Sequence, residues 1–120
     1  MYTRYKKSLE KIAMGLLSFM PNEKDVKKLQ QTMKQYEAEP DWKLLLWKEE
    51  EDIVGLVGLV HYDDEKRILI QHVSVNPSYR QQGIGHKMLK TLREQYNEYM
   101  FESTKETASF LDHCNVSEIG

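Results

Sequence analysis

The chain has little cysteine and no long hydrophobic run. Its one cysteine, Cys114, cannot form a disulfide within the chain, and its four histidines are too dispersed for the ligand spacing of a zinc site. No apolar segment approaches the length of a membrane-spanning helix. We therefore expect no disulfide framework, no bound metal and no insertion into a membrane.

The chain also lacks a strong excess of charge of either sign. Seventeen basic residues stand against 19 acidic ones, so the formal net charge is −2 at pH 7. This balance offers no general attraction for nucleic acid or for an anionic membrane surface. We expect neither of them as a partner.

The N-terminal region superficially resembles a signal peptide, because basic residues precede the apolar stretch from Ile12 to Met20. Glu10 and Lys11 interrupt the junction, however, and no small-x-small cleavage site follows it. The apolar residues also repeat at helical intervals. We interpret the stretch as part of an amphipathic helix and expect a cytoplasmic protein.

The apolar residues that are present, 40% of 120, suffice for one compact core, so we expect one domain over residues 1–120. Two amphipathic helices are predicted in its first third. One is ended by Pro21, and the other is capped by Asn22 and stops before Pro40. Their predicted inward residues are Tyr5, Leu9, Ile12, Ala13, Leu16, Leu17 and Met20, and then Val26, Leu29, Met33 and Tyr36.

Strands dominate the middle of the chain. The segments Trp42 to Trp47, Ile53 to Val60 and Arg67 to Val75 are predicted to form an antiparallel meander, and residues 1–4 are a candidate first strand. A helix with an apolar stripe of Met88, Leu89, Leu92 and Tyr96 follows and is expected to end near Tyr99. We then expect a short strand from Tyr99 to Phe101 and a last helix, opened by a Ser-x-x-Glu capping box and ending near residue 113.

The segment from Gln71 to Leu89 is the most informative, because it predicts a strand, a turn and a helix that begins at Gly83 and Gly85. The N–H groups at a helix start lack intrahelical partners, and the helix dipole is positive there. This end therefore stabilises an anion such as a phosphate group. Glycine allows close approach of the backbone, and Arg80 adds a charged donor.

Two other phosphate-binding motifs fit this segment poorly. A P-loop needs Lys and then Ser or Thr after its last glycine, where His86 and Lys87 stand. A dinucleotide fingerprint needs a third glycine at the position of Met88. Neither an ATP-type nor a dinucleotide site is therefore predicted.

The pattern Arg-x-x-Gly-x-Gly at Arg80, Gly83 and Gly85, preceded by Val-x-Val-x-Pro over residues 73–77, resembles the coenzyme A binding motif of GNAT-family N-acetyltransferases. The expected element order resembles the GNAT fold as well. This likeness implies an α+β fold, with a mixed, mainly antiparallel sheet flanked by helices. Residues 4–8, 11–25 and 72–78 further resemble the RibT proteins of bacterial riboflavin operons.

The resemblance also implies a function and a site. It implies acetyl-CoA as the cosubstrate and direct transfer of the acetyl group to a primary amine. By the motif, backbone groups of the strand bind the pantetheine arm, and amides of the glycine turn bind the pyrophosphate. The implied cofactor-binding residues are Val73, Ser74, Val75, Arg80, Gln81, Gln82, Gly83, Ile84, Gly85 and His86.

Two departures from the family pattern affect the expected chemistry. The family's usual Asn near the pantetheine and its usual thiolate-protonating Tyr correspond here to Thr104 and Leu111. Relatives also continue into two further strands, so the resemblance implies a sheet that is short at the C-terminus. An exposed sheet edge can pair with another copy, which makes a homodimer a reasonable hypothesis.

His72 is the predicted catalytic residue, because it lies on the central strand and an ordinary histidine pKa of about 6.5 suits a base near neutral pH. The ordinary alternatives are a packed or hydrogen-bonded histidine and a chain of water molecules that carries the proton. Two functions therefore remain open. One is an acetyl-CoA-dependent N-acyltransferase, and the other is a non-catalytic acyl-CoA-binding sensor with the same fold.

Overall fold

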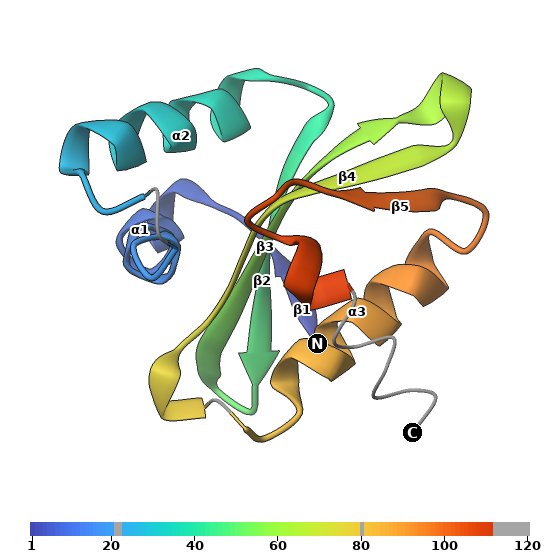
Figure 1. Cartoon of the computed structure of the whole chain (residues 1–120). Coiled ribbons are helices and arrows are strands. Elements are labelled where there is room, and N and C mark those ends of the chain that lie inside the picture. The colour runs from blue at the N-terminus through green and yellow to red at the C-terminus, as the bar shows by residue number, and fades with distance from the viewer. Residues whose placement is uncertain (21–22, 80, 112–120) are drawn as a thin grey trace.

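The computed structural model describes the whole chain except residues 21–22, 80 and 112–120. The described part contains a sheet of five strands in the order β1-β2-β3-β4-β5. Figure 1 shows α1 and α2 on one side of this sheet and α3 on the other. The elements are β1 (Tyr2–Arg4), α1 (Glu10–Leu17), α2 (Val26–Ala38), β2 (Trp42–Glu49), β3 (Asp52–Tyr62), β4 (Arg67–Val75), α3 (Ile84–Gln95) and β5 (Met100–Ser103).

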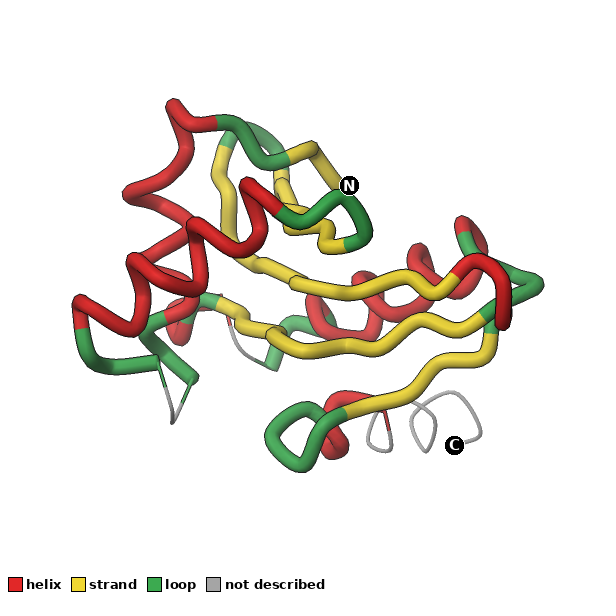
Figure 2. The backbone as a smooth tube through the Cα atoms, turned by 90° about the horizontal axis from the view of Figure 1, so that it is seen from above, coloured by secondary structure: helices red, strands yellow, loops and turns green. Residues whose placement is uncertain are grey.

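Strands β1 to β4 are antiparallel to their neighbours, whereas β5 lies parallel to β4. The mixed, mainly antiparallel sheet flanked by helices is the fold class that the sequence predicted. Figure 2 shows the strands side by side, with β5 at one edge of the sheet. The predicted bounds of β4 are confirmed, while β5 is shifted to Met100–Ser103 from the predicted Tyr99 to Phe101.

The first helix is shorter than predicted. A 3-10 turn (Lys7–Leu9) precedes α1, which begins only at Glu10. Ala13, Leu16 and Leu17 are buried as expected, but Ile12 is 44% exposed. A helix of two turns presents only a narrow stripe to the sheet, and Ile12 lies outside it.

The second helix is capped by Asp25, because the Lys27 N–H donates to Asp25 Oδ1 at 3.2 Å. The predicted cap, Asn22, lies outside the described residues. Val26 was predicted to face inward but is 61% exposed at the first helical position. The end of α2 at Ala38, before Pro40, is confirmed.

The last helix begins later than the capping box predicted. Residues 108–111 are helical, and residues 105–107 form a turn before them. The Thr104 N–H donates to Thr107 Oγ1 at 2.9 Å and closes this turn. A threonine hydroxyl thus replaces the predicted Ser-x-x-Glu contact at the helix start.

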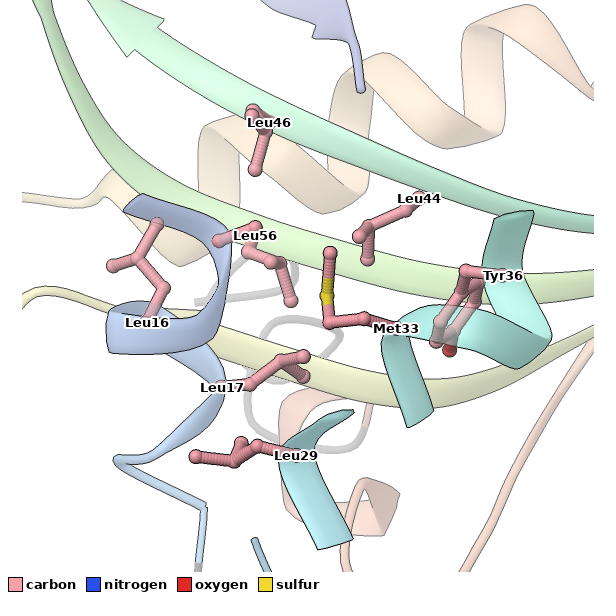
Figure 3. Close-up of a cluster of buried hydrophobic side chains, with 9 residues drawn as sticks. Leu16, Leu17, Leu29, Met33, Tyr36, Leu44, Leu46 and Leu56 are labelled. Carbon is pink, nitrogen blue, oxygen red and sulfur yellow. The ribbon is translucent and has the colours of Figure 1, made fainter. Parts of the chain in front are cut away.

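The two larger clusters of the core lie on opposite faces of the sheet. The first packs α1 and α2 against β2 and β3, and the second packs α3 against β3 and β4. Figure 3 shows the first cluster, in which Leu17, Met33 and Tyr36 extend from the helices toward Leu44 and Leu56 on the strands. Among the described residues, no helix has both the length and the apolar character needed to cross a membrane.

Candidate active site

The sheet opens between β4 and β5. The two strands pair only as far as Ile70 and Ser103, whereas β4 stays paired with β3 up to Val75. In the described part of the chain, residues 71–75 therefore have a strand neighbour on one side only. This leaves an open edge of β4 whose backbone groups are available to a ligand.

A β-bulge lies where the two strands separate. Gly58 is paired with His72 and Leu59 with Ile70, so Gln71 is the extra residue on β4. A bulge lets two consecutive residues oppose one residue of the partner strand and bends the bulged strand. Gln71 and His72 accordingly both line the same cavity.

The backbone direction after the bulge follows from one hydrogen bond. The Asn76 N–H donates to the Val54 carbonyl at 2.8 Å, so Asn76 faces β3. Antiparallel pairs alternate between bonded and non-bonded types, so His72 and Ser74 also face β3. Val73 and Val75 then direct their N–H and C=O groups toward the open edge. The structure thus places these two residues, but not the Ser74 backbone, on that edge.

The Thr107 side chain forms hydrogen bonds at the point where β4 and β5 separate. Its side chain is fully buried, and its hydroxyl donates to the Ile70 carbonyl at 2.7 Å. The same oxygen accepts the Thr104 N–H. One hydroxyl thus satisfies two backbone groups at the end of the β4–β5 ladder, where a strand partner is no longer present.

The start of α3 lies beyond the C-terminal end of β4. Gly83, with φ 76°, and Gln81, with φ 67°, are both in the left-handed region, so the chain turns sharply here. The first helical bond runs from the Lys87 N–H to the Gly83 carbonyl, at 3.0 Å. The N–H groups of residues 84–86 precede this bond and have no intrahelical acceptor. They form an anion-binding helix start at the end of the open edge.

Oγ of Ser74 on β4 and Nδ1 of His86 on α3 are buried polar atoms that have no hydrogen-bond partner among the described residues. Ile84 is buried, and Gln81, Gln82 and Gly83 are exposed. Of the predicted cofactor residues, the structure brings Gln81 to His86 together in one turn, and Arg80 lies outside the described residues. The unpaired His86 nitrogen and the free helix-start amides fit a phosphate-bearing cofactor.

A cavity of about 280 Å³ lies on the α1 and α2 side of the opened strands. It is formed by the segment between α1 and α2, by α2, by the bulge of β4 and by the turn after β5. Its polar and aromatic lining residues are Glu23, Lys28, Thr32, Gln35, Trp42, Gln71, His72, Thr104 and Glu106. It is therefore a polar cavity next to the open edge, with charges of both signs.

His72 forms hydrogen bonds through both of its ring nitrogens. Nδ1 lies 2.6 Å from the Tyr36 hydroxyl, and Nε2 lies 3.2 Å from Oε1 of Glu23. The other Glu23 oxygen accepts from the Thr32 hydroxyl at 3.2 Å. Glu23 is only 4% exposed. Four side chains from three separate segments thus form one continuous hydrogen-bonded chain beside the cavity.

Burial determines the charge of this group of side chains. It lowers the pKa of His72, although the Glu23 carboxylate opposes this effect. Burial also raises the pKa of Tyr36, so its hydroxyl remains protonated at neutral pH. The arrangement that satisfies every group has Tyr36 donating to Nδ1 and the neutral ring donating from Nε2 to Glu23.

Gly58 makes the contact between Tyr36 and His72 possible. It is paired with His72 across β3 and β4. A Cβ atom added at Gly58 would lie 2.0 Å from the Tyr36 hydroxyl oxygen. Only glycine therefore lets the Tyr36 ring cross over β3 to reach His72.

The two family departures have definite places in the structure. Leu111 is buried against Leu89, with Phe101 and Phe110 around them, so its position serves packing. Thr104 lines the cavity, and its hydroxyl lies 3.2 Å from that of Thr107. Leu111 cannot supply the acid that the family pattern places at its position. Among the described residues, no group of three or more His, Cys, Asp or Glu side chains could hold a metal ion.

Sequence reasoning missed Glu23, Thr32 and Tyr36 as site residues. Glu23 directly follows the predicted cap Asn22, and Tyr36 was predicted to be an inward residue of the same helix. The sequence offered one signal. Two polar residues, Glu23 and Thr32, lie nine positions apart in the same predicted helix. That pattern is common on solvated helices, so it does not single out a site.

An open strand edge next to an anion-binding helix start, with a polar cavity behind it, is the architecture of an acyl-CoA-dependent transferase. Residues 9–114 match the sequence model of the Acetyltransferase (GNAT) family, and the chain belongs to this family. It is also 59% identical, over 97% of its length and 96% of the relative's, to an uncharacterized N-acetyltransferase in the lysA 3′ region of Bacillus methanolicus. The chain is thus a GNAT-type N-acetyltransferase.

Solved structures show the same fold at low sequence identity. A transcriptional regulator from Bacillus halodurans superposes with a TM-score of 0.72 at 16% identity, covering 100% of this chain and 91% of that one. The aminoglycoside N-acetyltransferase AAC(6′)-Iy, solved in complex with CoA, superposes with a TM-score of 0.71 at 12% identity, covering 100% and 86%. These likenesses bear on the fold alone.

Proposed function

We propose that the protein transfers the acetyl group of acetyl-CoA directly to a primary amine. The observation that carries this proposal is the open edge of β4, because the outward backbone groups of Val73 and Val75 lead toward the free amides at the start of α3. An extended pantetheine arm would pair with the edge, and the pyrophosphate would lie against the helix start. The CoA complex of AAC(6′)-Iy, which has the same fold, supports the choice of cofactor.

The acceptor amine would enter from the cavity on the other side of the bulge. Acetyl transfer needs a positioned thioester, a donor for the developing oxyanion and a route for the amine's proton. Backbone N–H groups at the bulge supply a donor of the required kind. We propose that the proton leaves through the side chains that surround His72, the residue predicted from the sequence.

We further propose that the activity resides in one domain over residues 1–120, that the protein is RibT-like and that it acts in the cytoplasm. The resemblance of residues 4–8, 11–25 and 72–78 supports the second of these proposals. A homodimer formed through an exposed sheet edge is the assembly to test by size-exclusion chromatography with light scattering.

The test combines binding with turnover. Acetyl-CoA should raise the melting temperature as its concentration exceeds the dissociation constant, and ADP should raise it less. Release of free thiol is then followed over a panel of primary amines. Turnover on at least one amine supports the proposal. Binding without turnover on any amine would favour the alternative, a non-catalytic acyl-CoA sensor, and no thermal shift would contradict both.

A further inference from the structure

The α1–α2 segment contributes a carboxylate that the reaction can use. Glu23 lines the cavity, yet it is 4% exposed and sits on neither β4 nor α3. Burying a carboxylate is costly unless it is hydrogen-bonded. Here one oxygen accepts from Thr32, and the other lies at hydrogen-bond distance from His72. A buried charge held beside a substrate cavity is typical of a functional group.

His72 is poorly arranged to take a proton itself. In the neutral ring, Nε2–H donates to Glu23, which leaves Nδ1 as its only basic atom, and the Tyr36 hydroxyl occupies Nδ1 at 2.6 Å. Gly58 leaves the room that Tyr36 needs to hold this position. The ring therefore acts as a donor that holds the carboxylate. In contrast, each Glu23 oxygen accepts one bond and keeps acceptor capacity for another.

The charges around Glu23 come from several elements. Lys28 on α2 contributes a cation, Glu106 after β5 contributes a second carboxylate, and His72 on β4 is the neutral ring. Lys28 and Glu106 are exposed and solvated, whereas Glu23 is buried. Glu23 is thus the formal charge that is least screened by water. A cationic group that enters the cavity is attracted to it first.

From this arrangement we infer that Glu23 binds the acceptor as an alkylammonium ion and takes its first proton, with His72 as the residue that positions the carboxylate. The inference rests on the proposed acetyl transfer. It names the class of acceptor as an alkyl primary amine, which is protonated at neutral pH because its pKa is about 10.4, as in lysine. An arylamine enters uncharged and does not need this step.

The step balances as follows. An N–H bond of the ammonium breaks, and its proton forms an O–H bond on Glu23. The freed lone pair forms the N–C bond at the thioester carbonyl. The C–S bond then breaks, and the sulfur leaves with the second proton of the nitrogen. Glu23 releases its proton to water before the next cycle.

The test compares an alkylamine with an arylamine of similar size under saturating acetyl-CoA. Glu23→Gln should lower kcat/KM for the alkylamine by about 10² to 10⁴, the usual contribution of a general base, and lower the value for the arylamine far less. Glu106→Gln makes the same charge change on the same cavity and is the matched control, with a much smaller loss expected. Near-UV circular dichroism checks that each variant folds.

Variants of His72 separate positioning from proton transfer. The amide of His72→Gln can still donate to Glu23, so this variant should retain more activity than His72→Ala and keep the wild-type pH profile. Equal losses in His72→Gln and His72→Ala, with a moved pH inflection, would make His72 the base and overturn the inference. Equal losses for both amines in Glu23→Gln would also overturn it. A wild type without turnover would instead contradict the proposed function.

Discussion

The proposed donor side and the proposed acceptor side of β4 consist of different groups. The proposed donor side uses backbone groups, namely the outward groups of Val73 and Val75 and the amides at the start of α3. The proposed acceptor side uses side chains from distant segments, because Glu23 before α2 and Tyr36 on α2 both contact His72 on β4. Local sequence determines the first site, whereas packing of the whole fold assembles the second. Mutations should therefore affect the two sides in separable ways.

The largest expected effect is on the acceptor side, from Gly58→Ala. The added Cβ would lie 2.0 Å from the Tyr36 hydroxyl oxygen, so the ring must move and lose its bond to His72. We expect a loss of about 3 kcal/mol in the free energy of unfolding, typical of strong overpacking. Urea denaturation measures this loss.

The matched double variant Gly58→Ala with Tyr36→Leu removes the obstructing ring. The double variant should lose less stability than the sum of the losses of the two single variants, because the two positions are in contact. Additive losses would contradict the proposed steric role of Gly58.

The next largest loss of stability is expected at Thr107, where β4 and β5 separate. Thr107→Val keeps the shape of the side chain but leaves the Ile70 carbonyl and the Thr104 N–H without their partner. The bond to the Ile70 carbonyl is buried, whereas the bond from the Thr104 N–H is only partly buried. One buried unpaired group costs about 1 to 3 kcal/mol, so we expect a loss of about 2 kcal/mol. Thr107→Ser retains the hydroxyl and should lose less. Chemical denaturation of both variants measures these losses, and a Thr107→Val variant that is no less stable than Thr107→Ser would contradict the role of the hydroxyl.

A smaller effect is expected on the donor side, from Gly83→Ala. Gly83 has φ 76°, and an alanine in this region costs about 1 kcal/mol. The altered turn should also reorient the N–H groups at the start of α3 and so lower the affinity for CoA, which isothermal titration calorimetry measures. Gly85→Ala is the control for stability, because the nearest atom to its new Cβ is 3.8 Å away, on Phe110. Equal destabilisation by the two variants would contradict the role of the left-handed turn.

The smallest expected effect is a pH dependence of stability that originates on the acceptor side. Burial lowers the pKa of His72 in the folded chain, while the unfolded chain keeps a value of about 6.5. Between these two values the unfolded state binds more protons, so the free energy of unfolding falls as pH decreases below about 6.5.

His72→Gln removes this group, and its stability should fall less over the same interval. Urea denaturation at several pH values compares the two proteins. Parallel curves would show that His72 does not carry the effect.

Features that depend on local sequence were predictable, whereas features that depend on the packing of distant segments were not. The span of β4 and the glycine turn were predictable, because periodicity and glycine positions report on local backbone conformation, and the resemblance to the GNAT family implied the fold class. Ile12 and Val26 were misplaced, since only the packing of short helices decides which apolar residues face inward. Glu23 was missed because its partner, His72, is 49 residues away.

Gly58 also bears on how the acceptor preference of this enzyme can be altered. The Tyr36 ring fills the space above it, so the sheet under the cavity admits no larger residue at that point. Variation in the cavity is then restricted to the segment around Glu23 and to exposed α2 positions such as Lys28 and Gln35. Libraries for new acceptors should randomise that segment and helix and leave β3 unchanged.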